Sequence, residues 1–178
     1  MGLRKAASYS KKRIRTYTRK SAKRKKAYVK AIPAIKIVKY NMGNKAAHVA
    51  GKHNYVVSML ADEKAQMRDN ALESCRMIIN KSLEKEAPGE FYFEIKVYPH
   101  NILRENKTAA GAGADRLSSG MKHSFGITVG RSAIVSKGKE IFCVFCANEK
   151  VAQIAKKTLI KAKPKVPFKN KIVFNKVK

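Results

Sequence analysis

The sequence predicts an α+β fold: a two-layer sandwich in which two helices cover an antiparallel sheet, with a basic N-terminal arm and a long glycine-rich loop. Three observations lead to this prediction. Short runs rich in β-branched and aromatic residues are separated by turn signals, two longer runs show the helical period of 3.6 residues, and one long segment shows neither period. With 44% hydrophobic residues, the 178-residue chain can bury a core of its own.

The strands are predicted from apolar–polar alternation. Residues 90–98 show it most clearly, because Phe91, Phe93, Ile95 and Val97 fall on one face of an extended chain. A turn is expected at residues 41–44, and Lys137-Gly138-Lys139 is expected to be a hairpin turn. The other predicted strands are residues 32–40, 53–60, 130–136, 140–146 and 171–174.

The first predicted helix spans residues 61–86, with Ser58 or Asp62 as its cap, and it ends at Pro88-Gly89. It lies in the acidic segment of the chain and is therefore expected to face solvent rather than a polyanion. Its apolar stripe consists of Leu72, Cys75, Ile79 and Leu83.

The second predicted helix begins after the cap Asn148 and ends at Pro164 and Pro167. Its apolar face consists of Val151, Ile154, Ala155, Leu159 and Ala162.

The charge of the chain indicates a polyanionic partner. The formal net charge is +28, far more than solubility requires, and nucleic acid is the polyanion that best matches it. The charge is also uneven: residues 1–61 contain 17 Lys and Arg and residues 150–178 contain 10 Lys, and neither segment contains Asp or Glu.

Residues 1–30 form a predicted basic, RNA-binding arm. Tyrosines between the cations can stack on unpaired bases while Lys and Arg neutralise phosphates. The alternative is a disordered, solubilising tail. The predicted contacts are Arg4, Lys5, Tyr9, Lys11, Lys12, Arg13, Arg15, Tyr17, Arg19, Lys20, Lys23, Arg24, Lys25 and Lys26.

Residues 31–174 are predicted to form one domain with an inserted loop at 99–120, followed by a basic tail at 175–178. The whole stretch 98–126 has no apolar period, and long loops of this kind are usually functional or disordered. Its glycines allow either a close approach to a ligand or plain flexibility, and its cations either bind RNA or are simply solvated. The candidate RNA contacts are Arg104, Lys107, Gly111, Gly113, Arg116, Lys122 and His123.

No catalytic, metal or cofactor site is predicted. Cys143 and Cys146 are spaced as C-x-x-C, but a structural zinc needs about four ligands and no second pair follows, so both are interpreted as strand core. No nucleophile–base pair, nucleotide-binding motif, transmembrane run or signal peptide is recognisable, and no small-molecule substrate or membrane partner is expected. The odd number of cysteines favours a reducing cytoplasm.

Several segments together resemble one ribosomal protein family. They are GLRKAASY near the start, AIPAIKIVKYNMGN, ALESCRMIINK, YPHNILRENK and AGAGADRLSSGMKHSFG. These segments resemble the archaeal and eukaryotic large-subunit ribosomal proteins of the uL16 family, whose bacterial counterpart is L16. The resemblance covers residues 2–174, and the short C-terminus resembles the archaeal members. The segment GITVGRSAIV departs from the eukaryotic pattern.

The resemblance implies a structural constituent of the large ribosomal subunit in the cytoplasm, with an α/β-hammerhead fold. It implies binding to large-subunit rRNA between the central protuberance and the peptidyl transferase region, beside neighbouring ribosomal proteins. It also implies that residues 101–119 approach the acceptor ends of tRNA. Neither a catalytic residue nor a cofactor is implied.

Two other classes of protein remain open. A non-ribosomal RNA- or DNA-binding protein would share the charge, although a DNA-compacting protein rarely needs so long a loop. An RNA-modifying enzyme would need a nucleophile or a cofactor pocket, and the sequence shows neither.

Overall fold

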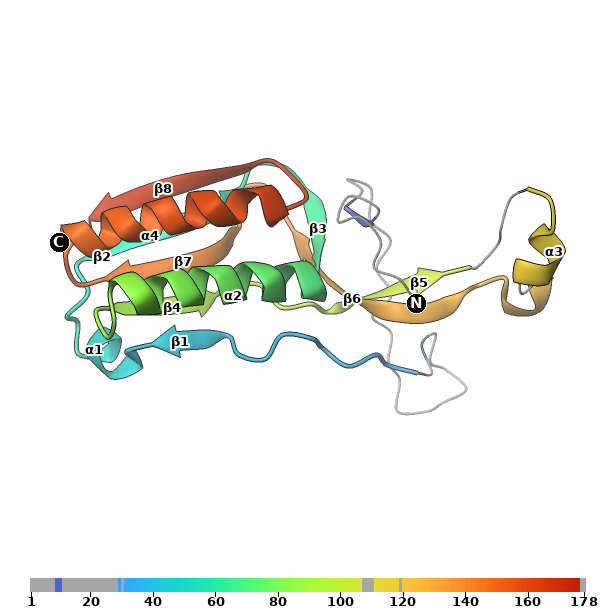
Figure 1. The fold of residues 1–178 in the computed structure, drawn as a ribbon, viewed down its shortest axis with the longest axis horizontal. Coiled ribbons are helices and arrows are strands. Elements are labelled where there is room, and N and C mark those ends of the chain that lie inside the picture. The colour runs from blue at the N-terminus through green and yellow to red at the C-terminus, as the bar shows by residue number, and fades with distance from the viewer. Residues whose placement is uncertain (1–8, 11–28, 30, 107–110, 119, 177–178) are drawn as a thin grey trace.

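The computed structural model describes residues 9–10, 29, 31–106, 111–118 and 120–176. It is a mixed α+β structure with two antiparallel sheets. The larger sheet has the strand order β1-β4-β7-β2-β8, and helices α2 and α4 lie side by side on one of its faces (Figure 1). Its strands are β1 (Asn41–Gly43), β2 (Tyr55–Ala61), β4 (Phe91–Ile95), β7 (Glu140–Cys146) and β8 (Asn170–Lys176).

The smaller sheet has the strand order β3-β6-β5, from β3 (Ala65–Arg68), β5 (Asn101–Glu105) and β6 (Ile127–Val135). The helices are α1 (Lys45–Val49), α2 (Asp69–Glu86), α3 (Ala114–Leu117) and α4 (Glu149–Ala162), with 3-10 turns η3 (Gly120–His123) and η4 (Lys163–Lys165).

The core lies between the larger sheet and the two long helices. The predicted stripe of α2 is fully buried, and so are Phe91 and Phe93 of the predicted alternating strand. The predicted face of α4 also contacts this core, since Val151, Ala155 and Leu159 are buried. The helical and strand periods therefore identified the two layers correctly. Asn148 is the N-cap of α4, as predicted, but its side chain makes no capping hydrogen bond.

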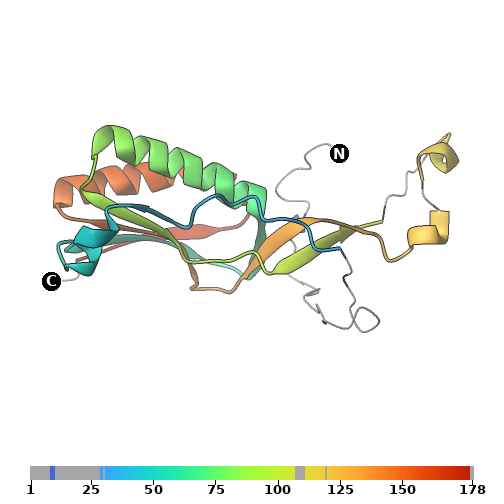
Figure 2. The same cartoon turned by 90° about the horizontal axis from the view of Figure 1, so that it is seen from below.

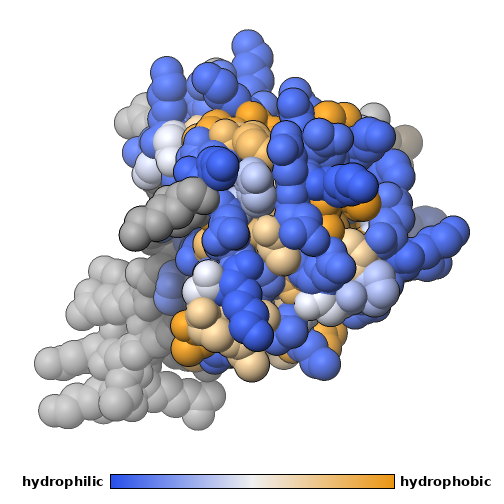
Figure 3. Space-filling view, turned by 90° about the vertical axis from the view of Figure 1, so that its left-hand side faces the viewer, coloured by the Kyte–Doolittle hydropathy of each residue, from blue (hydrophilic) through white to orange (hydrophobic). Residues whose placement is uncertain are grey.

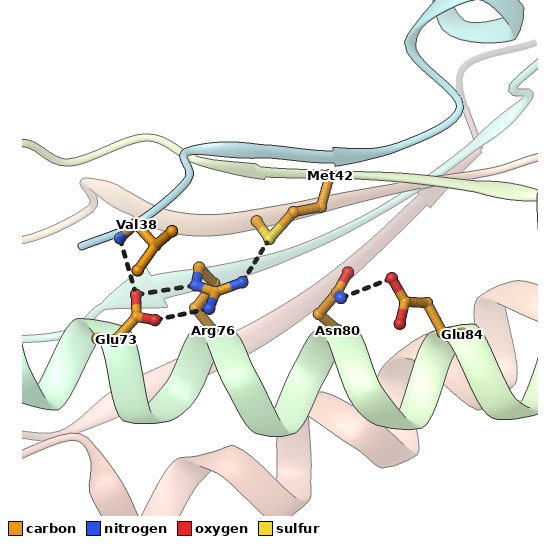
Figure 4. Close-up of polar contacts among 6 residues, drawn as sticks. All are labelled: Val38, Met42, Glu73, Arg76, Asn80 and Glu84. Carbon is orange, nitrogen blue, oxygen red and sulfur yellow. Dashed lines mark hydrogen bonds and ion pairs between the residues drawn. The ribbon is translucent and has the colours of Figure 1, made fainter.

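The predicted strand at 32–40 is wrong. This segment forms no strand, because two of its N–H groups bond to side chains of α2 instead, as Figure 4 shows for Val38. At its end, the carbonyl of Tyr40 accepts a 2.9 Å hydrogen bond from Ile95 of β4. The N–H of Lys36 donates to Asp69 at 3.2 Å, and the N–H of Val38 donates to Glu73 at 3.3 Å. Arg76 holds Glu73 in place through bonds of 2.8 and 2.6 Å, and this contact lowers the pKa of the Glu73 carboxyl.

The predicted turn at 41–44 is also wrong. Residues 41–43 form β1, which pairs with β4 at the edge of the larger sheet. Asn44 then begins α1, because its side-chain oxygen accepts a 2.9 Å hydrogen bond from the N–H of Ala47.

The first long helix begins later than predicted, at Asp69 rather than near Ala61. Residues 65–68 form β3 instead, which pairs with β6. Ser58 and Asp62 are therefore not caps: Ser58 lies within β2, and Arg68 is the N-cap of α2. The helix ends at Glu86, before Pro88-Gly89, as predicted.

The predicted hairpin at Lys137-Gly138-Lys139 is a turn, but it does not join two paired strands. β6 belongs to the smaller sheet and β7 to the larger one. The turn is fastened to the end of β2 instead, since the N–H of Gly138 donates to the carbonyl of Ala61 at 2.7 Å and the carbonyl of Lys139 accepts from the Ala61 N–H at 3.0 Å. The chain thus passes from one sheet to the other at this point.

Candidate nucleic-acid interface

A two-stranded ribbon projects from the body of the molecule. It consists of β5 and the first part of β6, and it carries α3 and η3 at its far end (Figures 1 and 2). The prediction of a structureless stretch at 98–126 is therefore wrong in part. Residues 101–105 are a strand, in register with β6 from Asn101–Ser132 to Glu105–Ile127.

A buried polar cluster crosses the three strands of the smaller sheet at the root of the ribbon. The side-chain amide of Asn101 donates to Gln66 at 3.1 Å, and the Ser132 hydroxyl donates to the same Gln66 oxygen at 2.8 Å. Asn101 also lies 3.4 Å from the Ser132 hydroxyl. All three residues are buried, so their hydrogen bonds require one register between the strands. This cluster fixes the ribbon to the body.

The neck of the loop, where β5 ends and β6 begins, is closed by Arg104. Its guanidinium carbon lies 3.2 Å from the ring centroid of Phe125, and its terminal nitrogen donates to the carbonyl of Gly126 at 2.8 Å. A cation on an aromatic face and a charge-assisted hydrogen bond both favour the closed neck. Arg104, a predicted RNA contact, therefore has a structural role within the protein.

Gly126 allows the two chains of the neck to come this close. Its φ is +78°, and a Cβ there would lie 2.6 Å from the carbonyl carbon of Glu105 and 2.8 Å from the backbone nitrogen of Asn106. Any other residue would have to displace backbone rather than a side chain. The glycine is thus required by the geometry of the neck.

The tip of the ribbon is exposed. Gly113 precedes α3 with a φ of +76°, and Gly111 also has a positive φ, of +113°. Arg116, on α3, is exposed, and so is Met121, at 81%. The tip therefore exposes the guanidinium of Arg116 and the backbone of Gly111 and Gly113 to its surroundings. Of the other predicted loop contacts, Lys107 lies outside the described residues. Lys122 and His123 belong to η3, and for these two residues the structure describes the backbone alone.

Tyr9 is the one predicted arm contact that falls among the described residues. Its hydroxyl donates to the Glu105 carboxylate at 3.2 Å, and the guanidinium carbon of Arg68 lies 5.4 Å from its ring centroid. This part of the arm therefore lies beside the ribbon, between Arg68 at its root and Glu105 at its neck. The other thirteen predicted contacts, in residues 4–5 and 11–26, lie outside the described residues.

Three histidines, His48, His53 and His100, pack against other rings. His48 lies over Phe145 and Tyr92, with ring centroids 4.2 and 4.6 Å away, and 5.7 Å from His53. Burial, and secondarily the charge of His48, lowers the pKa of His53. The ring of His100 lies tilted against that of Tyr98, with the ring centroids 4.4 Å apart. These rings pack against one another, and none of them lies in a group of metal-ligating residues within the described part of the chain.

The cysteines are buried and free. Burial raises the pKa of each of Cys75, Cys143 and Cys146 to about 12, so the thiols stay protonated at neutral pH. This agrees with the prediction that Cys143 and Cys146 are strand core. Within the described residues, no helix is long and apolar enough to cross a membrane.

Sequence reasoning missed several residues that organise this interface. Phe125 contacts Arg104, and both Arg68 and Glu105 contact Tyr9. In each of these pairs the two residues lie far apart in the sequence. Arg131 was missed as well. Its guanidinium donates to the carbonyl of Pro33 at 2.8 Å, and this bond ties the segment that follows the arm to β6. Only the position of Phe125, directly before a glycine, offered a local signal.

Comparison with known proteins identifies the family. The family model "Ribosomal protein L16p/L10e" matches residues 15–173. The large ribosomal subunit protein uL16 of Methanococcus maripaludis strain C7 is 44% identical over 177 residues, which cover 99% of this chain and 96% of that protein. The protein of the same name from Archaeoglobus fulgidus is 39% identical over 150 residues, 84% of this chain and 83% of the relative. The chain thus belongs to the L16p/L10e family of ribosomal proteins, which are structural components of the large subunit and not enzymes.

Proposed function

We propose that the protein is a structural constituent of the large ribosomal subunit in the cytoplasm, where it binds large-subunit rRNA and contacts neighbouring ribosomal proteins. The observation that carries this proposal is the match to the uL16 relatives along the whole chain. A net charge of +28 on a folded body with its own core supports it, because rRNA supplies the counter-charge. The fold would be of the α/β-hammerhead type.

The ribbon has a separate role in this proposal. The body and the arm of residues 1–30 dock on rRNA between the central protuberance and the peptidyl transferase region, and residues 101–119 reach toward the acceptor ends of tRNA. Three features support this division: the ribbon projects from the body, the neck holds it closed at Arg104, and Arg116 is exposed at the tip. Predicted loop contacts with RNA are Arg104, Lys107, Gly111, Gly113, Arg116, Lys122 and His123.

Co-sedimentation with ribosomal subunits tests the main proposal. We expect the protein to remain with large subunits through a moderate-salt wash and to bind large-subunit rRNA more tightly than duplex DNA at the same salt. Recovery in the free fraction, or equal affinity for DNA, would instead support a general nucleic-acid-binding protein.

Salt dependence tests the arm. Replacing Lys23, Arg24, Lys25 and Lys26 by Gln should reduce the slope of log affinity against log salt concentration by about 3, at roughly 0.7–0.9 for each phosphate that the arm no longer neutralises. An unchanged slope would mean that this part of the arm does not touch RNA.

A further inference from the structure

The outward face of α4 and η4 is strongly basic. It carries six lysines, which we call the α4 lysine face: Lys150, Lys156, Lys157, Lys161, Lys163 and Lys165. All six are exposed. The buried residues of α4, among them Val151, Ala155 and Leu159, point the other way into the core, so the helix needs none of these lysines for its packing.

The two long helices lie side by side but carry opposite charge. Helix α2 contains four acidic and three basic residues, for a net charge of −1, and α4 contains one glutamate and four lysines, for a net charge of +3. α4 covers the β8 side of the sheet and α2 covers the β1 and β4 side (Figure 1). One edge of the α4 lysine face, at Lys161, therefore borders the carboxylates of α2, and a polyanion can approach the face from the opposite, β8 side.

Only two of these lysines have a polar partner within the described part of the chain. Lys165 donates to Ser74 at 2.9 Å, and Lys161 lies 4.0 Å from Glu86. Among the residues that the structure describes, no carboxylate lies within ion-pair distance of the remaining four, Lys150, Lys156, Lys157 and Lys163.

Helix stability does not account for this arrangement. Lys150 lies in the first turn of α4, where the helix dipole favours acidic residues. Lys157 and Lys161 are four residues apart, where like charges repel each other. Lys161 lies in the last turn, where the dipole favours a cation, but Lys150 and the repulsion between Lys157 and Lys161 weaken the isolated helix slightly, and an external anion would remove that cost.

The spacing and chemistry favour a phosphate backbone. Lys150, Lys157 and Lys161 follow one line along a helix of 14 residues, which is about 21 Å long. Lysine is a compact point charge on a flexible stem, and it neutralises phosphates without requiring one fixed geometry. The exposed face of α4 has no aromatic residue, whereas proteins that bind single strands usually stack bases on aromatic rings.

A protein partner is the less favourable occupant. At the end of the body where α4 begins, hydrophilic side chains cover most of the surface, and apolar areas show between them (Figure 3). Ile160, at 51% exposure, is the exposed large apolar residue of α4. Protein interfaces generally centre on a larger apolar patch.

We propose that the α4 lysine face binds the phosphate backbone of double-helical rRNA, as a second anchor that is separate from the N-terminal arm. This inference rests on the proposed ribosomal function. It assigns rRNA contacts of the body, for which the proposed function names no residues, to the helical side of the larger sheet.

The test compares two variants of the full-length protein that lose the same charge. The first carries Lys150→Gln, Lys156→Gln and Lys157→Gln. The control carries Lys81→Gln, Lys85→Gln and Lys137→Gln, which replace exposed lysines on α2 and in the turn before β7. Glutamine and lysine have similar helix propensity, and circular dichroism should show both variants folded.

The probes are deproteinised large-subunit rRNA, a 20-base-pair RNA hairpin and single-stranded poly(U). For rRNA and the hairpin, the α4 variant should lose about 2–3 from the slope of log affinity against log salt concentration, and the control less than 1. The loss on poly(U) should be smaller. Equal slopes for the two variants would overturn the inference, and so would a defect confined to poly(U).

Two further outcomes separate this inference from the function on which it rests. If the wild-type protein itself fails to bind rRNA, the proposed function fails with it. If rRNA binding is unchanged but the α4 variant is lost from large subunits during a salt wash, the face binds a neighbouring protein and the RNA assignment is wrong.

Discussion

The guanidinium carbon of Arg104 lies 3.2 Å from the ring centroid of Phe125, and the same side chain donates a 2.8 Å hydrogen bond to the carbonyl of Gly126. The two strands of the ribbon are thereby joined at the place where they would otherwise separate. A loop that starts from a closed neck keeps a defined direction relative to the body, even if its tip moves.

Arg104→Lys should loosen this neck. Lysine keeps the charge but lacks the planar guanidinium, which makes both the ring contact and the bond to the carbonyl. These two interactions together are worth about 1–2 kcal/mol, so hydrogen exchange at residues 127–130 should quicken roughly tenfold. Arg116→Lys, at the exposed tip, is the matched control and should leave these amides unchanged. Equal exchange in wild type and Arg104→Lys would show that Arg104 does not hold the strands together.

Gly126→Ala should be more damaging than Gly113→Ala. Both glycines have nearly the same φ, +78° and +76°, so the cost of the left-handed conformation, about 1–2 kcal/mol, is common to both. Only at Gly126 would the new Cβ also meet backbone, at 2.6 Å, whereas nothing lies within 4 Å at Gly113. Urea unfolding should therefore give Gly126→Ala the larger loss of stability. Similar losses would mean that the neck tolerates a shift of backbone.

The two layers could be predicted from the sequence because their signals are local. The stripe of α2 and the alternation at Phe91 and Phe93 repeat along a single element, and each was found buried. The β5 strand carries no such signal. Asn101, Ile102 and Leu103 are buried in succession, since the strand is covered on both sides and one side is the polar cluster with Gln66. Period-2 alternation disappears in that situation.

The contacts that organise the interface could not be predicted for a different reason. Arg104 and Phe125 are 21 residues apart, and Tyr9 and Glu105 are 96 apart. Residues 32–40 were misassigned because an extended segment can bond to side chains instead of a neighbouring strand, as Val38 does to Glu73. Such pairings depend on the tertiary arrangement and not on the pattern of one segment.

Replacing Cys143 and Cys146 by Ala should destabilise the protein in a pH-dependent way. At pH 7 the double variant should lose about 1–3 kcal/mol through cavities in the strand core and should still bind rRNA. Burial raises the pKa of both thiols from 9.0 to about 12, so the folded state holds these protons more tightly than the unfolded state. The wild-type thiols therefore favour the folded state fully below pH 9 and lose this advantage as the pH rises toward 12.

Urea unfolding at pH 8, 9, 10 and 10.5 measures this effect. The stability difference between wild type and double variant should shrink above pH 9, by up to about 1.4 kcal/mol per thiol for each pH unit, and should vanish or change sign by pH 10.5. Tyr40 and Tyr92, whose pKa values are also raised by burial, titrate in both proteins and cancel from the difference. A constant difference would show that the thiols are accessible, and stoichiometric zinc in the purified protein would contradict their assignment as core.

Shortening the loop should separate binding from function. Replacing residues 107–118 by a brief linker keeps Arg104, Phe125 and Gly126, so the neck and the core stay intact. Thermal stability and rRNA binding should be nearly unchanged, while subunits carrying the variant should translate slowly or fail late in maturation. A loop of unchanged length, with residues 107–118 replaced by glycine and serine, tests whether reach alone suffices. Wild-type translation by subunits with the shortened loop would contradict a role toward tRNA.

The physical reason is the small area that the tip can bury. Gly111, Gly113 and Arg116 are exposed, and ordering a backbone costs about 1–2 kcal/mol per residue, which exposed residues do not offset. We therefore expect the tip to be mobile in the free protein and to become ordered on the assembled subunit, where phosphates neutralise its cations. Hydrogen exchange on the free protein measures this directly: residues 106–119 should exchange quickly while α2 and β7 remain protected. Strong protection across 106–119 would mean that the loop is already ordered, and a shortened loop would then affect stability as well as translation.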